Sequence, residues 1–171
     1  QPEAEPIVIL EVNELEMLKK FLSYFATGGY NQIVGYNVGF DVRFIFARAL
    51  YWRLPCKEFL DAELYDVMQI MAQVKEEFVF KAQPGGKLQG WSKTLLGIIQ
   101  KETEEDQLTA YKLKNYDLVI EFNKTHVEET FILWTLIQLV KGNYYSGEVF
   151  GSPPGSPAFI YTNGIIKTGM T

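Results

Sequence analysis

The chain has 171 residues, of which 47% are hydrophobic and 22% are charged, and its formal net charge at pH 7 is −5. This length suffices for one domain with a continuous core, and the composition is that of a globular protein. An acidic chain is poorly suited to tight non-specific phosphate binding, so a nucleic-acid partner has to be argued from a local site.

The single cysteine, Cys56, excludes an internal disulfide and a Cys-based zinc cluster, and the single histidine, His126, excludes a multi-histidine metal site. A lone cysteine is typical of a reducing compartment. The sequence has no apolar run of about 18 residues and no signal-peptide pattern at its N-terminus. We therefore expect an intracellular protein, cytoplasmic or nucleoid-associated, with no membrane partner.

An apolar run at residues 7–10 predicts a buried strand. Asn13 follows as the predicted cap of a helix in which apolar residues recur at i, i+3 and i+4 spacing. Gly28 and Gly29 are expected to end that helix. A second strand is predicted at residues 32–34.

The stretch GYNVGFD comes next, and its Gly and Asn residues predict a turn that leads into a helix at residues 41–52. Asp41 would then lie in the first helical turn, where the helix dipole and free backbone N–H groups favour an anion. A third strand is predicted at 57–61 and a further helix at 63–74. Strands that alternate with helices predict an α/β fold with a mainly parallel sheet covered on both faces.

In the second half of the chain, residues 83–90 predict a loop and 91–98 a short helix closed by Gly97. The polar stretch KETEEDQ predicts a solvated turn. A long helix is predicted at residues 115–141, with apolar residues throughout.

The C-terminal part differs in character. Residues 151–157, GSPPGSP, are typical of a linker, and Asn163-Gly164 between β-branched and aromatic residues predicts a hairpin turn. We expect a main domain over residues 1–142, followed by an appendage of linker and hairpin over 143–171.

These segments resemble a known family. GYNVGFD, LDAELYDVMQ, LQGWSKTLLGI and the long helix are similar to the DnaQ-like 3′–5′ exonuclease domain of the ribonuclease H-like superfamily, especially that of family B DNA polymerases and its stand-alone relatives. The resemblance implies a mixed sheet flanked by helices. It also implies hydrolysis in which two divalent cations, Mg²⁺ or Mn²⁺, hold the scissile phosphate between four carboxylates, the DEDD set.

The resemblance assigns roles to the residues of GYNVGFD. Asp41 is implied as the third carboxylate of the set, hence a catalytic residue and metal ligand. Asn37 is implied to lie near the nucleotide, with Phe40 packed beneath the turn and fixing its backbone. Arg43, on the helix behind Asp41, is a candidate for a phosphate contact.

The family's third motif places Tyr or His four residues before an Asp on the terminal helix, so that both point from one face. The matching positions hold Phe122 and His126. Phenylalanine has no hydroxyl to orient water, and neutral imidazole is a poor Mg²⁺ ligand. His126 is therefore a vestigial or surrogate catalytic residue, and Phe122 a candidate nucleic-acid contact. In a shifted register, Glu128 or Glu129 would reach inward instead.

The family's first motif, Asp-x-Glu on the first strand, is the missing part. The literal DAE at residues 61–63 follows the second motif and predicts the start of a helix, whereas EVN at 11–13 would be a decayed copy. The first two strands of the family's sheet are thus missing, displaced, or supplied by the C-terminal hairpin in a permuted order. The remaining alternatives are a segment upstream of Gln1 and a second chain.

Three functions remain open. The first is an exonuclease-like domain with a degenerate catalytic set that serves as a nucleic-acid-binding or structural module, with single-stranded nucleic acid, a protein partner or a larger polymerase or nuclease chain as its partner. The second is an active Mg²⁺- or Mn²⁺-dependent 3′–5′ exonuclease whose first motif lies upstream or in another chain. The third is a protein-interaction scaffold, which the acidic charge favours.

Overall fold

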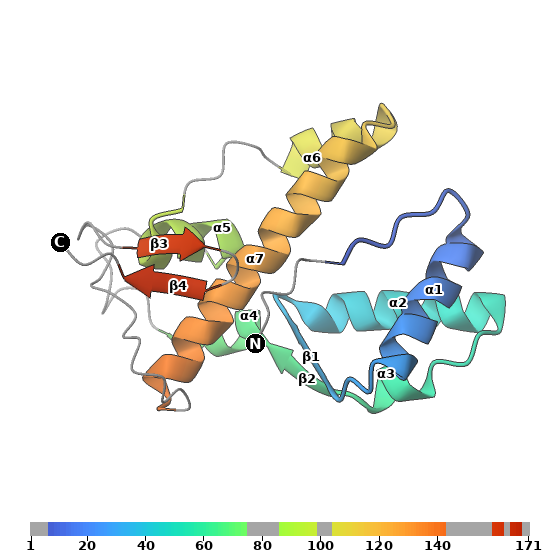
Figure 1. Cartoon of the computed structure of the whole chain (residues 1–171), viewed down its shortest axis with the longest axis horizontal. Helices are drawn as coiled ribbons and strands as arrows, with labels where there is room; N and C mark the ends of the chain where they lie inside the picture. The colour runs from blue at the N-terminus through green and yellow to red at the C-terminus, as the bar shows by residue number, and fades with distance from the viewer. Residues whose placement is uncertain (1–6, 75–85, 99–103, 143–158, 163–164, 169–171) are drawn as a thin grey trace. The chain divides into compact units, whose positions relative to one another are not determined.

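The computed structural model describes residues 7–74, 86–98, 104–142, 159–162 and 165–168 (Figure 1). The chain divides into two compact units, which we call the N-terminal unit (Ile7–Gln69) and the C-terminal unit (from Ile70). The predicted linker at 151–157 lies outside the described residues, so the predicted domain boundary at residue 142 stays a prediction. Within the described ranges, no helix is both long and apolar enough to cross a membrane.

The N-terminal unit alternates helices and strands, as the sequence predicts. Its elements are α1 (Glu14–Thr27), β1 (Gln32–Gly35), α2 (Val38–Trp52), α3 (Lys57–Asp61), β2 (Glu63–Asp66) and α4 (Val67–Met71), which continues past Gln69. β1 and β2 form a two-stranded parallel sheet in which Gly35 pairs with Asp66. The predicted mixed α/β class is confirmed, with a small sheet and a high helix content.

Helix α1 begins and ends where the sequence places it. The side chain of Asn13 accepts hydrogen bonds from the backbone N–H groups of Leu15 at 2.9 Å and Glu16 at 3.3 Å. These bonds satisfy donors that a helix N-terminus otherwise leaves free. The helix ends at Thr27, and the second following glycine, Gly29, takes a φ of 63°.

Two of the predicted strands are wrong. Residues 7–10 carry no strand, and Ile7, Val8 and Leu10 are exposed, because no neighbouring strand pairs with this apolar segment in the described residues. The segment Lys57–Asp61 is helix α3 rather than a strand, with its first and last side chains in an i, i+4 ion pair. The strand starts at Glu63 instead, which shortens the predicted 63–74 helix to α4.

The core of the N-terminal unit is aromatic. The ring of Phe59, which is only 3% exposed, meets Phe21 and Phe25 edge-on, with centroid distances of 5.4 Å to each. Edge-to-face contacts of this kind add stability beyond the burial of apolar area. Ala49 of α2 and Leu22 of α1 complete the same cluster, so α3 joins the two longer helices.

A charged residue also ties α1 to α2. The carboxylate of Glu14 accepts hydrogen bonds from Arg48 Nε at 2.6 Å, from Arg48 Nη2 and from Trp52 Nε1 at 2.8 Å. The bonds from Arg48 and then Trp52 lower the pKa of Glu14. The first turn of α1 is therefore fixed to the last turns of α2.

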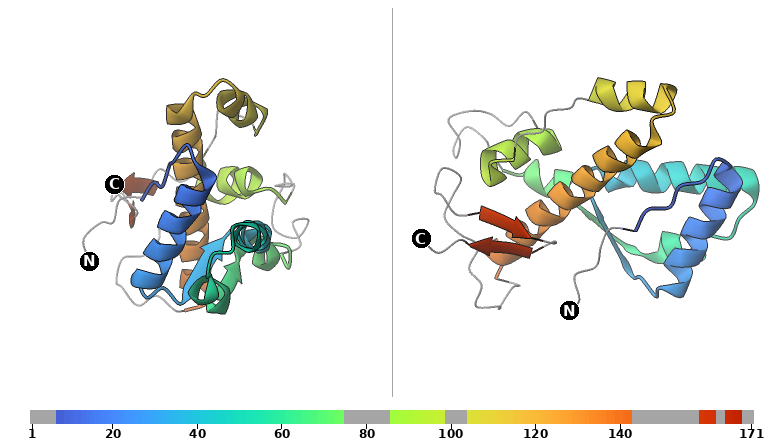
Figure 2. Two further views of the ribbon diagram at one scale, coloured as in Figure 1. Left: turned by 90° about the vertical axis from the view of Figure 1, so that its right-hand side faces the viewer. Right: turned by 45° about the horizontal axis from the view of Figure 1, so that its top comes forward.

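The C-terminal unit is mostly helical. Its elements are α5 (Leu88–Trp91), the π-helix η2 (Ser92–Leu96), α6 (Glu104–Lys112), α7 (Tyr116–Val140), β3 (Phe159–Thr162) and β4 (Ile165–Thr168). The long helix α7 agrees with the prediction to within one residue at each end. α6 contacts α7, and the two lie side by side near the start of α7 (Figure 2). The predicted solvated turn KETEEDQ is wrong in part, because α6 already begins at Glu104.

The C-terminal strands form the predicted hairpin pair. β3 and β4 are antiparallel, with Phe159 opposite Thr168, and they make a two-stranded sheet separate from that of β1 and β2. The hypothesis that this hairpin supplies strands to the first sheet is therefore not confirmed. Its turn, Asn163-Gly164, lies outside the described residues.

Truncation of the central ring tests the aromatic core. Phe59→Ala should lower the free energy of unfolding by about 3–5 kcal/mol, because it removes a buried ring from between two others and leaves a cavity. The measurement is urea unfolding, with amide hydrogen exchange in α1 as the local readout. Leu60→Ala, at an exposed neighbouring position, is the control and should cost less than about 1 kcal/mol. Equal losses in the two variants would contradict the assignment of the core.

Candidate functional site

The site begins at the end of β1, where the chain turns sharply into α2. A Cβ atom added to Gly35 would lie 2.8 Å from Cβ of Val38, closer than two such atoms can approach. Val38 itself is buried, so it cannot move away to make room. The close approach of the two backbones at this corner therefore requires glycine at position 35.

Asn37 gives the turn its direction. Its backbone is left-handed, with φ 62° and ψ 35°, a conformation that asparagine tolerates better than most residues. Its N–H donates a hydrogen bond of 2.9 Å to Oδ1 of Asp66, and its side chain makes no capping bond. The amide side chain, which is exposed, is thus left available at the surface.

Asp66, at the end of β2, holds this turn from the neighbouring strand. Its Oδ1 also accepts a 3.0 Å hydrogen bond from the N–H of Met68, so one carboxylate oxygen binds two backbone amides. The sequence did not identify Asp66 as a site residue. An acidic residue at the end of the second parallel strand would have been the signal. Because that strand was predicted at residues 57–61 and not at Glu63–Asp66, Asp66 was not recognised as its last residue.

Asp41 lies in the first turn of α2, as predicted, and is exposed. Desolvation of its carboxyl group by surrounding protein raises its pKa, a hydrogen bond to its own backbone acts in the opposite direction, and the negative charge of Asp66 raises it further. The two carboxylates therefore interact electrostatically, although they belong to different elements.

The other predicted residues of this turn point outward. Phe40 is 59% exposed, so the expectation that it packs beneath the turn is wrong; the buried position belongs to Val38. Arg43 is exposed on the next turn of α2, where it is accessible to an anion. The N-terminal unit thus presents an amide, a ring, a carboxylate and a guanidinium from one short segment.

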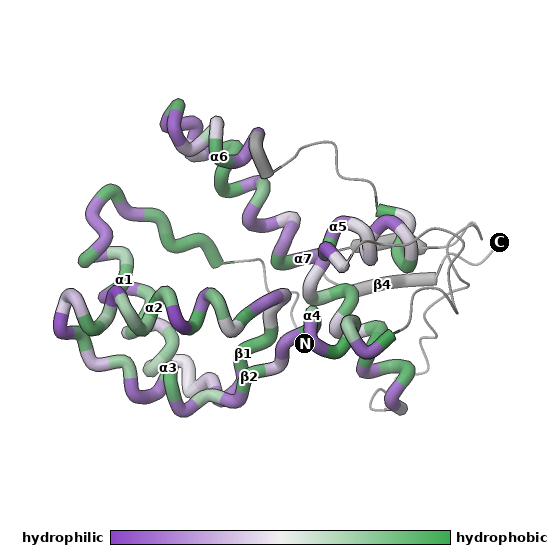
Figure 3. Tube along the Cα trace, turned by 180° about the vertical axis from the view of Figure 1, so that it is seen from behind, coloured by the Kyte–Doolittle hydropathy of each residue, from purple (hydrophilic) through white to green (hydrophobic). Residues whose placement is uncertain are grey.

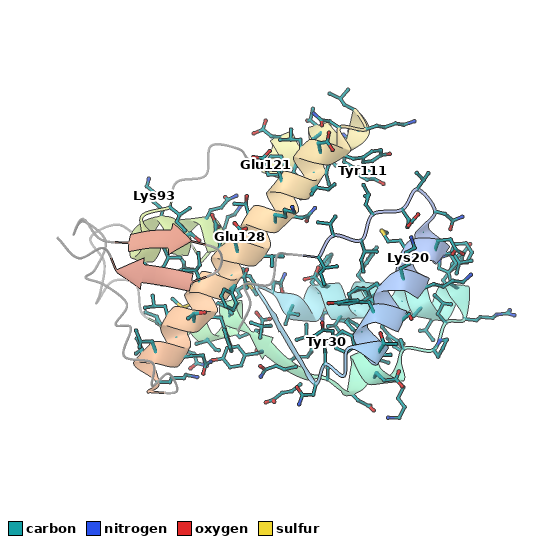
Figure 4. All side chains as sticks on the ribbon, in the orientation of Figure 1. Lys20, Tyr30, Lys93, Tyr111, Glu121 and Glu128 are labelled. Carbon is teal, nitrogen blue, oxygen red and sulfur yellow. The ribbon has the colours of Figure 1, made fainter. Side chains whose placement is uncertain are left out.

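In the C-terminal unit, one face of α7 carries the residues predicted for the third motif. Phe122 and Glu129 are buried and His126 is half-buried, at i, i+7 and i+4 positions. The buried Phe122 has little side-chain surface for a nucleic acid, and its predicted contact stays a prediction. Glu128, labelled on α7 in Figure 4, is half-buried, so Glu129 is the acid that turns inward.

Glu129 occupies an unusual environment. The residue is 2% exposed, and its Oε2 accepts a hydrogen bond of 3.1 Å from Oγ of Ser92 in η2, while Oε1 has no hydrogen-bond partner among the residues that the structure describes. A buried carboxylate with only one neutral donor is costly for a folded protein.

The arrangement in the N-terminal unit has a clear chemical capacity. Carboxylate oxygens such as those of Asp66 at the end of β2 and Asp41 in the first turn of α2 are suitable ligands for Mg²⁺ or Mn²⁺. These ions often keep several waters and bind through one or two carboxylates and a substrate phosphate. In the described part of the chain, however, no three His, Cys, Asp or Glu side chains lie together so that they could hold a metal ion.

The electrostatic link between the two carboxylates is testable by titration. Asp66→Asn should bring the pKa of Asp41 part of the way back towards its ordinary value, because the substitution removes the charge but not the desolvation. The folded state binds this proton more tightly than the unfolded chain, so ionisation of Asp41 reduces stability as the pH rises through its folded pKa. The measurement is an NMR pH titration of the carboxyl carbon.

Asp61→Asn is the matched control for that titration, because Asp61 is exposed and pairs with Lys57. It should leave the pKa of Asp41 unchanged. A pKa of Asp41 that does not respond to Asp66→Asn would disprove the electrostatic link.

Comparison with known proteins identifies the family. The model of the exonuclease domain of DNA polymerase family B matches residues 1–118, more than half of the chain. No curated protein and no solved structure matches. The match includes the whole GYNVGFD turn and ends near the start of α7, before Phe122 and His126. It confirms the resemblance seen in the sequence, and the chain belongs to the DNA polymerase family B exonuclease-domain family.

Proposed function

We propose that this exonuclease-type domain binds single-stranded nucleic acid through the turn at the end of β1 and that its own residues do not complete a two-metal catalytic set. The observation that carries the proposal is the hydrogen bond from Asn37 to Asp66, which fixes the turn so that Asn37, Phe40 and Asp41 are all exposed on one short segment. An amide, an aromatic ring and a nearby guanidinium are groups that contact bases and phosphates in nucleic-acid complexes.

The composition of α7 supports the second half of the proposal. An active member needs a carboxylate on this helix, and the matching position holds His126, a half-buried imidazole. The neighbouring position on the same face holds Phe122, whose ring cannot orient a water. Both differences remove parts of the same hydrolytic step, so binding without cleavage is the function that these residues support best.

The donor set fits a single hard cation better than a pair. Asp41 and Asp66 offer carboxylate oxygens from adjacent elements, and one oxygen of Asp66 is already used by two backbone amides. A Mg²⁺ or Mn²⁺ ion held by these carboxylates would help to bind a phosphate of the strand. Partner proteins, including a larger polymerase or nuclease chain in nucleic-acid metabolism, belong to the same proposal.

One observation favours an active exonuclease as the second candidate. Glu129 places a buried carboxyl group on the inward face of α7, three residues after His126, and within the described ranges one of its oxygens lacks a hydrogen-bond partner. In that case Glu129 would replace the missing acid of α7. The first motif would come from a segment upstream of Gln1 or from another chain.

Binding can be measured directly by fluorescence anisotropy with labelled single-stranded DNA and RNA. The wild-type chain should bind in the presence of EDTA, with an affinity that falls as salt rises. Asn37→Gly keeps the left-handed backbone but removes the amide, and it should weaken binding about threefold to tenfold, the loss of roughly one hydrogen bond. Asn31→Gly, at an exposed position before β1, is the control and should change binding less than about twofold.

A nuclease assay with the same strands separates the two candidates. With Mg²⁺ or Mn²⁺ the wild-type chain should leave the labelled strand intact. Cleavage that Asp41→Asn abolishes would replace the proposal with the active exonuclease, and the absence of any binding at low salt would reject a nucleic-acid role for this chain.

A further inference from the structure

The outer face of α2 carries an aromatic stripe. At 100° per residue, Phe40, Phe44, Ala47 and Tyr51 fall within about 60° of one another around the helix axis. Phe44 is 56% exposed and Tyr51 is 66% exposed, similar to Phe40. The core residues of α2, among them Val38 and Ala49, lie on the opposite side. We define Phe40, Phe44 and Tyr51 as the aromatic stripe.

Such a face is unusual for a helix at a protein surface. Surface helices normally place polar residues opposite the core, but α2 is rich in apolar residues around its circumference, and hydrophobic segments recur along it in Figure 3. Exposed apolar residues that gather on one face, unlike scattered ones, commonly mark a binding surface. Because the exposed residues of the stripe are aromatic rings, a ligand with flat apolar faces is suited to it.

The charges around the stripe indicate which ligand. Between Val38 and Arg53 the chain carries three arginines and one acid, Asp41, within an overall acidic protein. Arg43 is exposed about 60° from Phe40 around the helix, Arg48 is paired with Glu14, and Arg53 is exposed at the C-cap of α2. Aromatic side chains with the exposed guanidinium of Arg43 beside them match a single strand, whose bases stack on rings and whose phosphates are anionic.

One ring of the stripe is already held in position. The guanidinium of Arg48 lies over the ring of Tyr51, 4.7 Å from its centroid, and Arg48 is in turn fixed by Glu14. Trp52 meets the same ring edge-on at 5.0 Å. Because the Tyr51 side chain is already ordered, stacking a base on its ring costs less side-chain conformational entropy.

We propose that the aromatic stripe is a stacking track for single-stranded nucleic acid, which runs from the Asn37–Asp41 turn along α2. This inference rests on the proposed function and adds a surface to it, since Phe40 belongs to both the turn and the stripe. From Phe40 to Tyr51 the helix rises about 16 Å, long enough for more than one nucleotide to lie along it. The track thus extends the contact from the nucleotide at the turn to its neighbours along the strand.

Alanine substitution along the stripe tests the track. Phe44→Ala and Tyr51→Ala should each weaken binding of a twelve-nucleotide strand at least about fivefold, the loss of one stacked base. Neither should change the salt dependence, whereas Arg43→Gln should reduce it. Phe44→Tyr should bind the strand as wild type does, unlike Phe44→Ala, because tyrosine keeps the stacking surface. Binding of a two-nucleotide strand, which reaches only the turn, should change less than about twofold in both alanine variants.

Phe46→Ala is the matched control, because Phe46 is an aromatic residue of the same helix, 39% exposed, that lies about 120° from Phe40 around the axis. It should change binding less than about twofold. All variants are first compared with wild type by circular dichroism and urea unfolding, so that only folded proteins are scored.

The outcomes separate this inference from the function on which it rests. A wild-type chain that binds no single strand at low salt rejects both. A wild-type chain that binds, with Phe44→Ala and Tyr51→Ala indistinguishable from Phe46→Ala, rejects the track and leaves binding at the turn in place. If the two alanine variants instead abolish a concentration-dependent dimer seen by light scattering and bind strands normally, the stripe is an interface between copies and the track is rejected.

Discussion

The candidate site depends on the carboxylate of Asp66, which is half-buried, whereas Asp41 is exposed. Asp66 uses a single oxygen to hold the backbone amides of Asn37 and Met68, and so it joins the end of β2 to the start of α2 and to α4. Within the described residues β1 pairs only with β2, and this bond ties the end of β2 to the turn that follows β1. The bond fixes the backbone at the start of the segment that carries the exposed residues Asn37, Phe40 and Asp41.

The parts of the fold that the sequence predicted are those decided by neighbouring residues. The cap at Asn13 and the length of α7 are set by local hydrogen bonds and by apolar periodicity, which are visible in a single sequence. The strand predicted at residues 7–10 failed because an apolar run becomes a strand only when another strand pairs with it. The strand predicted at Lys57–Asp61 is wrong because a local ion pair and the burial of Phe59 favour a helix there.

The site shows the same division. Asp41 and Asn37 were named as candidates because they belong to one continuous motif, whereas Asp66 is 29 residues from Asn37 and meets it only through the parallel pairing of β1 and β2. Glu129 was named only as an alternative, and its contact with Ser92 required the packing of η2 against α7. Phe40 was placed on the wrong side of the turn, because helix periodicity alone does not say which residue at a helix start faces the core.

The geometry of the corner at Gly35 and Asn37 has a consequence for how such domains change over time. The close approach to Val38 admits only a residue without a side chain at position 35, and the left-handed backbone at position 37 favours asparagine, aspartate or glycine. Both requirements come from the path of the chain and would persist in a descendant that had no chemistry to perform. A motif of this kind records the shape of an ancestor more durably than it records that ancestor's reaction.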